Sequence, residues 1–162
     1  MTNLAMDPLT LGHIAITLIG IASGLIALAA MVKGREAKGW IALFLLFTVL
    51  TSVSGFFFAA DHITPAQIVG ALSLLVLALA LYALYGRQLA GPWRLVFVGT
   101  ATLALYLNCF VLVVQLFLKV PPLHALAPAG SGPVFGAAQG VVLLAFVVAG
   151  GLAARNFRPS VI

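Results

Sequence analysis

The sequence contains very few charged residues: 8 basic and 3 acidic side chains among 162 residues, or 7 % of the chain. A soluble domain carries about 25 % charged residues and is about 45–50 % apolar, whereas hydrophobic residues make up 64 % of this chain. So few charges cannot keep a surface in water. The composition therefore excludes a soluble enzyme, a nucleic-acid-binding protein and a disulfide scaffold. It predicts an integral membrane protein whose first partner is the lipid bilayer.

Catalytic motifs and disulfides are also missing. The single cysteine, Cys109, lies inside an apolar run, so no internal disulfide can form. The chain has no GxSxG, HExxH or CxxC motif and no phosphate-binding glycine loop. A cleavable signal peptide requires basic residues before its apolar run. This chain has none before the first apolar run, so we expect the first helix to be retained. An enzymatic activity has no support among these motifs.

Long hydrophobic runs, in contrast, are abundant. A membrane-spanning helix needs about 20 apolar residues to cross roughly 30 Å of hydrocarbon. Five runs have this length, and they define the predicted spans: 9–32, 40–60, 65–85, 93–118 and 134–154. Residues 119–133 connect the last two spans and contain four prolines, a composition that breaks helices. We therefore predict one all-α, polytopic membrane domain, 1–162, with five transmembrane helices.

The basic residues predict the orientation of these helices. If the chain crosses the membrane five times, seven of the eight basic residues fall on one side: Lys33, Arg35, Lys38, Arg87, Arg94, Arg155 and Arg158. Cytoplasmic loops are enriched in lysine and arginine, so the N-terminus is predicted outside and the C-terminus in the cytoplasm. Trp40 and Trp93 fall at the same boundary, where amphipathic rings prefer to lie.

Polar side chains concentrate on the predicted outer side. Polar groups within a membrane usually face the bundle interior or a wet cavity, so we expect a shallow external pocket that binds a small ligand or an ion. The residues predicted to line it are His13, Asp61, His62, Gln115, Lys119, His124 and Gln139. The alternative interpretation is that these residues collect at the interface because the membrane interior rejects them.

The three histidines leave a second hypothesis open. Imidazoles together with a carboxylate can bind zinc or copper, two facing histidines can ligate a haem, and protonation can gate a pocket. His13, His62 and His124 are therefore candidate metal ligands, although they show no HxxH or HxxxH spacing. A haem or transition metal is expected only under this alternative.

The fourth predicted span has a polar face. Asn108, Gln115 and Lys119 are seven and four residues apart, so they lie on one side of a helix, with Asn108 near the middle of the bilayer. The second span presents Thr48, Thr51 and Ser52 on one face, at spacings of three and four. These groups could line a polar path, or they could hold helices together with bonds of about 0.6 kcal/mol each.

Two further segments have distinctive compositions. Gly20 and Gly24 are four residues apart, a spacing that predicts close helix packing, either against the second span or against a second copy of the chain. The connection 119–133 carries Leu123 and Leu126, and Phe135 follows it. These apolar anchors predict that it folds back as a cap over the outer end of the bundle. A packed loop without a ligand is the alternative.

The order of residues resembles that of small bacterial multi-pass families. The first hairpin runs from His13 to Lys33-Gly34. It resembles families of unknown function that pair an outer histidine with a Lys-Gly-x-x-His turn. In this chain Ala37 stands where those families have the second histidine. The stretch from Asn108 to Gln139 is similar to a block in uncharacterised proteobacterial membrane proteins. This resemblance implies a five-helix protein of the bacterial inner membrane, and it implies no activity.

The sequence therefore predicts a non-enzymatic inner-membrane protein. It would bind a small ligand or ion in the external pocket, or act as a subunit of a membrane complex, channel or transporter, with a homo-oligomer among the expected assemblies. The alternative is a redox or metal protein that uses the histidines of the outer side.

Overall fold

The computed structural model describes residues 7–58, 62–128 and 130–159, and this part of the chain is helical without a strand. Five helices are long and apolar enough to cross a membrane. They are α1 (Pro8–Val32), α2 (Lys38–Ser54), α3 (Pro65–Leu81), α4 (Trp93–Lys119) and α6 (Pro133–Asn156). Two short turns, η1 (Gly55–Phe57) and η2 (Tyr82–Gly86), extend α2 and α3. The predicted all-α fold with five membrane-spanning helices is confirmed.

The helix boundaries follow local sequence signals. A proline occupies the first turn of α1, α3 and α6, where its missing N–H would have no helical partner. At α3, the Thr64 hydroxyl accepts a hydrogen bond from the Gln67 backbone N–H, and the Gln67 side chain accepts one from the Thr64 N–H. Each predicted span begins within two residues of the start of the corresponding observed helix.

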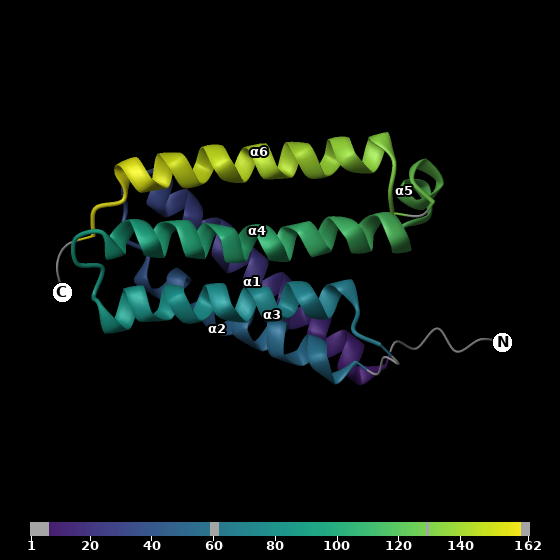
Figure 1. Ribbon diagram of the computed structural model, residues 1–162, viewed down its shortest axis with the longest axis horizontal. Helices are drawn as coiled ribbons and strands as arrows, with labels where there is room; N and C mark the ends of the chain where they lie inside the picture. The colour runs from purple at the N-terminus through teal and green to yellow at the C-terminus, as the bar shows by residue number, and fades with distance from the viewer. Residues whose placement is uncertain (1–6, 59–61, 129, 160–162) are drawn as a thin grey trace.

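The connection between α4 and α6 is more ordered than its prolines predict. It contains a six-residue helix, α5 (Pro121–Leu126), which starts with two prolines and packs against the end of α4 (Figure 1). Leu126 is 60 % exposed, so it is no anchor, and the prediction for this residue is wrong; Ala127 is buried instead. The rings of Phe117 and Phe135 meet edge to face with centroids 5.5 Å apart, which ties the end of α4 to the start of α6.

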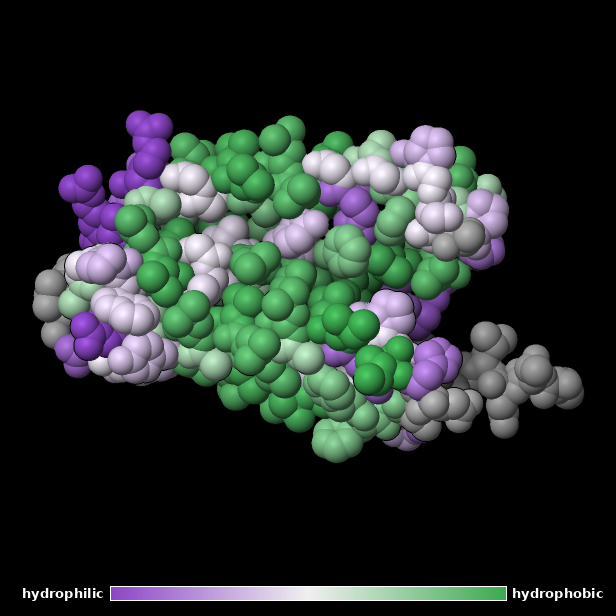
Figure 2. All heavy atoms as spheres, viewed as in Figure 1, coloured by the Kyte–Doolittle hydropathy of each residue, from purple (hydrophilic) through white to green (hydrophobic). Residues whose placement is uncertain are grey.

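The five long helices form a closed up-and-down bundle. α1 packs against α2, α2 against α3, α3 against α4 and α4 against α6, and α6 returns to α1. In Figure 1, α6, α4 and α3 lie in front, while α1 crosses obliquely behind α4. Figure 2 shows hydrophobic side chains over the middle of the bundle and hydrophilic ones at its ends.

Helix α1 approaches α2 and α4 closely at two glycines. A Cβ atom added to Gly24 would lie 2.6 Å from Leu105 Cδ1 and 2.7 Å from Phe44 Cδ2, so no side chain fits there without displacing the core. A Cβ atom at Gly20 would lie 3.4 Å from the Phe47 backbone of α2. The structure thus places both glycines against α2 of the same chain.

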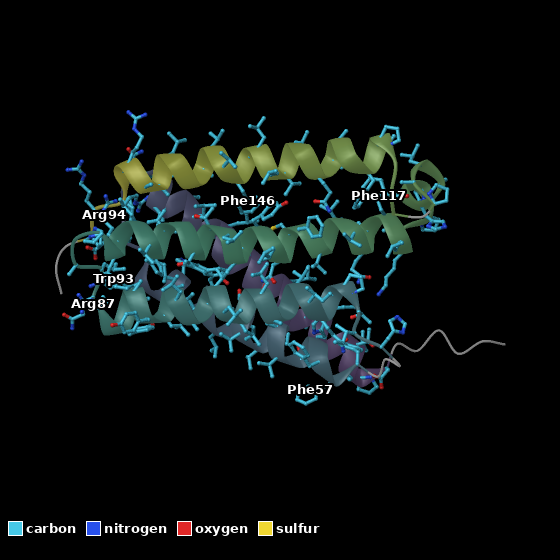
Figure 3. The ribbon with its side chains drawn as sticks, viewed as in Figure 1. Phe57, Arg87, Trp93, Arg94, Phe117 and Phe146 are labelled. Carbon is cyan, nitrogen blue, oxygen red and sulfur yellow. The ribbon has the colours of Figure 1, made fainter. Side chains whose placement is uncertain are left out.

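One end of the bundle carries seven of the eight basic residues, and Lys119 lies at the other end. At the basic end, Arg94 Nη1 donates hydrogen bonds to the carbonyl oxygens of Ala154 (2.8 Å) and Phe157 (2.6 Å), where α6 finishes. The Arg87 guanidinium lies over the Trp93 ring, 5.3 Å from its centroid. Figure 3 shows these side chains at one end of the bundle. The orientation predicted from this charge distribution stays a prediction.

Candidate functional site

The predicted polar residues come from several elements at the end of the bundle opposite to the basic end. His13 lies near the start of α1, His62 precedes α3, Gln115 and Lys119 lie in the last turns of α4, and His124 lies on α5. Gln139 lies in the second turn of α6, and Asn108 lies deeper, in the middle of α4. Asp61 lies outside the described residues.

His13 forms a hydrogen bond and an aromatic contact with residues at and beyond the end of α2. Its Nδ1 atom lies 2.8 Å from Ser54 Oγ of α2, and its half-buried ring meets the Phe58 ring edge to face at 5.1 Å. Ser54 Oγ donates its single proton to the Thr51 carbonyl oxygen. This network therefore favours the histidine tautomer that carries its proton on Nδ1 and donates it to Ser54.

Asn108 forms a hydrogen bond between two helices deep in the bundle. Its Nδ2 atom donates to Thr48 Oγ1 at 3.3 Å, and both side chains are buried. The distance is long for a hydrogen bond of this kind, so its contribution to stability is small. This geometry matches the interpretation of these residues as bonds that hold helices together.

Gln139 joins α6 to α4. Its Nε2 atom donates to the Phe110 carbonyl oxygen at 3.1 Å, while its Oε1 atom is buried without a hydrogen-bond partner in the described part of the chain. The neighbouring contact between these helices is aromatic, with the Tyr106 and Phe146 rings 5.8 Å apart. Figure 3 shows Phe146 reaching from α6 towards α4.

A row of hydroxyl groups on α2 connects the deep pair with His13. Thr48, Thr51 and Ser54 are three residues apart, so they form one polar strip from the Asn108 bond to the histidine. The Thr51 hydroxyl is buried and has no partner within the described residues. Sequence reasoning found Thr48, Thr51 and the buried Ser52 and missed Ser54, although the three-residue spacing of the two threonines continues to it.

The other two histidines lie apart from this strip. His62 and His124 are exposed, and no hydrogen bond, ion pair or ring contact joins them to His13 within the described structure. In the same residues, no group of three His, Cys, Asp or Glu side chains could hold a metal ion. Gln115 is half-buried. The structure therefore brings His13 and Ser54 together and leaves His62 and His124 at the surface.

Two cavities lie away from the predicted polar residues. An open, apolar groove of about 420 Å³ follows α6 and reaches Val32 at the end of α1. A cavity of about 10 Å³ lies in the core beside Gly24 and Phe44, and it has at most the room of a single water molecule. The arrangement at the histidine end has the chemistry of interhelical hydrogen bonding, and Lys119 ends α4 at the same end of the bundle.

Comparison with protein-family models, with curated proteins and with solved structures finds no match for this chain. The resemblance to small bacterial membrane families therefore stays a prediction. The function has to be argued from the surfaces and polar groups of the chain itself.

Proposed function

We propose that the protein is a non-enzymatic subunit of a larger membrane assembly and docks through α6. A channel or transporter complex falls within this proposal, as does an assembly of identical chains. We place it in the bacterial inner membrane with the N-terminus outside and the C-terminus in the cytoplasm, because seven of the eight basic residues gather at one end of the bundle.

The observation that carries the proposal is the surroundings of two glycines on α6. A Cβ atom added to Gly136 or Gly140 would meet nothing within 4 Å in the described structure. The fold of this chain therefore does not need a glycine at either position. A glycine inside a helix costs about 1 kcal/mol relative to alanine, and lipid tails pack equally well around larger side chains.

A helix from another subunit gives these glycines a role. Gly136 and Gly140 are one helical turn apart, and Val147 lies on the same side, since each residue advances the helix by about 100°. We call these three residues the glycine face. Small residues four apart let two membrane helices approach closely. α6 also has the fewest contacts to lose, because only Gln139 and Ala153 of its described residues are buried.

The test compares two glycines that are equally open in the described structure. Gly140 lies on the glycine face, whereas Gly99 is exposed on α4 and also has nothing within 4 Å of an added Cβ atom. The mass of the protein extracted from native membranes in polymer-bounded discs should exceed that of one chain. Gly140→Leu should reduce this mass, and Gly99→Leu should leave it unchanged. A wild-type mass of one chain, or an equal effect of both substitutions, would contradict the proposal.

A second function, binding of a small ion at the histidine end, is favoured by the unpartnered Thr51 hydroxyl. Lys119 lies at the same end of the bundle and carries a positive charge, so chloride is a suitable probe. Replacing gluconate by chloride should raise the melting temperature of the wild type. Thr51→Val should remove this shift, because valine has the same shape without the hydroxyl. Equal chloride effects on both proteins would exclude this site.

The redox alternative predicts colour or bound metal. Within the described residues no group of three His, Cys, Asp or Glu side chains could hold a metal ion, and His62 and His124 are exposed. We therefore expect purified protein without a Soret band and without stoichiometric zinc, copper or iron. A Soret band, or one metal per chain that is lost in His13→Ala, would restore this alternative.

A further inference from the structure

The open groove along α6 lies on a different side of this helix from the glycine face. Its lining includes Val141, Leu144, Val148 and Leu152 of α6, which are three or four residues apart, together with Val32 of α1. At about 100° per residue, the centre of this row lies roughly a third of a turn away from Gly136 and Gly140. A molecule bound in the groove would therefore be separate from one packed against the glycine face.

The length of the groove corresponds to one leaflet of a bilayer. Val141 and Leu152 are eleven residues apart, which is about 16 Å at 1.5 Å per residue. Half of the roughly 30 Å hydrocarbon core is about 15 Å. One end of the groove lies at the basic end of the bundle, and the other lies near the level of the bilayer middle. An acyl chain of a single lipid has the matching length and polarity.

Two basic residues stand at the shallow end of the groove. Arg155 is exposed and lies seven residues beyond Val148, so it continues the same side of α6. Lys33 is exposed and directly follows Val32, the residue of α1 that lines the groove. A phosphate group placed above an acyl chain in the groove would meet both positive charges.

The ends of α1 and α6 are held together at this point. Asn156 Nδ2 donates a hydrogen bond of 2.7 Å to the Val32 carbonyl oxygen. Gly34 has a φ of +68°, and a Cβ atom added to it would lie 3.0 Å from the Asn156 carbonyl oxygen. The turn after α1 therefore lies against the end of α6, and Lys33 and Arg155, each next in sequence to a residue of this contact, lie at the same end of the groove.

We propose that this groove binds one anionic phospholipid, with an acyl chain along α6 and its phosphate between Lys33 and Arg155. A second copy of the chain in parallel orientation would bring its own basic end to the same opening, and the like charges would repel. The nearby acid, Glu36, lies 3.7 Å from the ammonium group of Lys38, which offsets its charge. This site is independent of the glycine face and of the orientation in the membrane.

Native mass spectrometry of the full chain tests this site. The probes are phosphatidylglycerol and phosphatidylcholine with identical acyl chains, added at equal concentrations. The wild type should retain one phosphatidylglycerol in preference to phosphatidylcholine. Lys33→Gln and Arg155→Gln should each lower this preference about five-fold. Val148→Trp should fill the groove and remove the binding of both lipids.

Two matched variants control for charge and size. Arg87→Gln removes a positive charge at the same end of the bundle but far from α6 (Figure 3), and Leu75→Trp adds a large side chain at an exposed position of α3. Neither should change the lipid preference. Should Val148→Trp fail to fold, the two charge variants decide, because Lys33 and Arg155 are exposed.

Three results would overturn the proposal. The first is equal retention of both lipids by the wild type. The second is a loss of preference in Arg87→Gln as large as in Arg155→Gln. The third is a dimer in lipid-free detergent that Val148→Trp dissociates, which would make a second copy the occupant. Gly140→Leu should leave lipid retention unchanged, so a failure of the assembly proposal is distinguishable from a failure of this one.

Discussion

Gly24 and Gly140 have the same side chain, yet their surroundings are opposite. Gly24 lies on α1, where a Cβ atom would come within 2.7 Å of side chains of α2 and α4, whereas a Cβ atom at Gly140 meets nothing within 4 Å in the described structure. In the membrane-spanning stretches of α1 and α4, 39 % of each stretch is buried, but in that of α6 only 11 % is buried. The comparison teaches that Gly24 serves the packing of the fold, whereas Gly136 and Gly140 of α6 are available for another molecule.

The largest expected effect concerns the hydrogen bonds that attach α6 to the rest of the bundle. Arg94→Gln removes two hydrogen bonds from a guanidinium group to the Ala154 and Phe157 carbonyl oxygens. Bonds to charged groups contribute about 1.5–3 kcal/mol each, so the free energy of unfolding in detergent should fall by about 3 kcal/mol. Arg87→Gln, which removes only a ring contact at the surface, should cost less than about 1 kcal/mol. Equal losses would show that α6 is not held by these bonds.

Substituting the two glycines by alanine should give effects of opposite sign. Gly24→Ala should lower the free energy of unfolding by about 1–3 kcal/mol, because the methyl group overfills the core near Leu105 and Phe44. Gly140→Ala should raise it by up to about 1 kcal/mol through better helix propensity. Denaturation of both variants in one detergent measures the difference. Stabilisation by Gly24→Ala would contradict the tight packing of α1.

The unpartnered hydroxyl of Thr51 gives a test with a smaller effect. A buried hydroxyl without a partner costs about 1–3 kcal/mol, and the described structure shows none for Thr51 Oγ1. Thr51→Val should therefore raise the free energy of unfolding by about 1 kcal/mol in gluconate buffer. Ser54→Ala, which removes the partner of His13, serves as a control and should lower it. A loss of stability in Thr51→Val without chloride would mean that the hydroxyl has a bonding partner.

The smallest expected effect is the coupling between Asn108 and Thr48. Their hydrogen bond of 3.3 Å should give a coupling free energy of about 0.6 kcal/mol in a double-mutant cycle of Asn108→Ala and Thr48→Val. A coupling above about 2 kcal/mol would indicate a polar network with a larger role than joining α2 to α4.

The helices were predictable from sequence because their causes are local. Hydropathy over about 20 residues defines each span, and prolines such as Pro65 mark the helix starts. The same reasoning applied to 119–133 missed α5, because two adjacent prolines were interpreted as helix breakers although Pro121 and Pro122 begin a helix. Proline is compatible with a first turn, so its position relative to the helix start decides its effect.

The candidate site was less predictable because it depends on contacts between distant segments. Placing His13, His62 and His124 on one side of the membrane did not determine whether they meet, and two of them lie exposed in a loop and on α5. The spacing of Gly20 and Gly24 predicted close packing but not the partner, which follows only from the path of α2. The stretch 141–155 reads as plain apolar helix until the fold places Val32 of α1 beside it.

Photo-crosslinking in native membranes tests the central claim about α6 most directly. A photoreactive side chain is introduced at Val147, which is 62 % exposed on the glycine face, or at Leu75, which is 72 % exposed on α3. The account predicts a discrete protein adduct from position 147, either a second copy or another polypeptide, and only lipid adducts from position 75. Lipid adducts alone at both positions would contradict it.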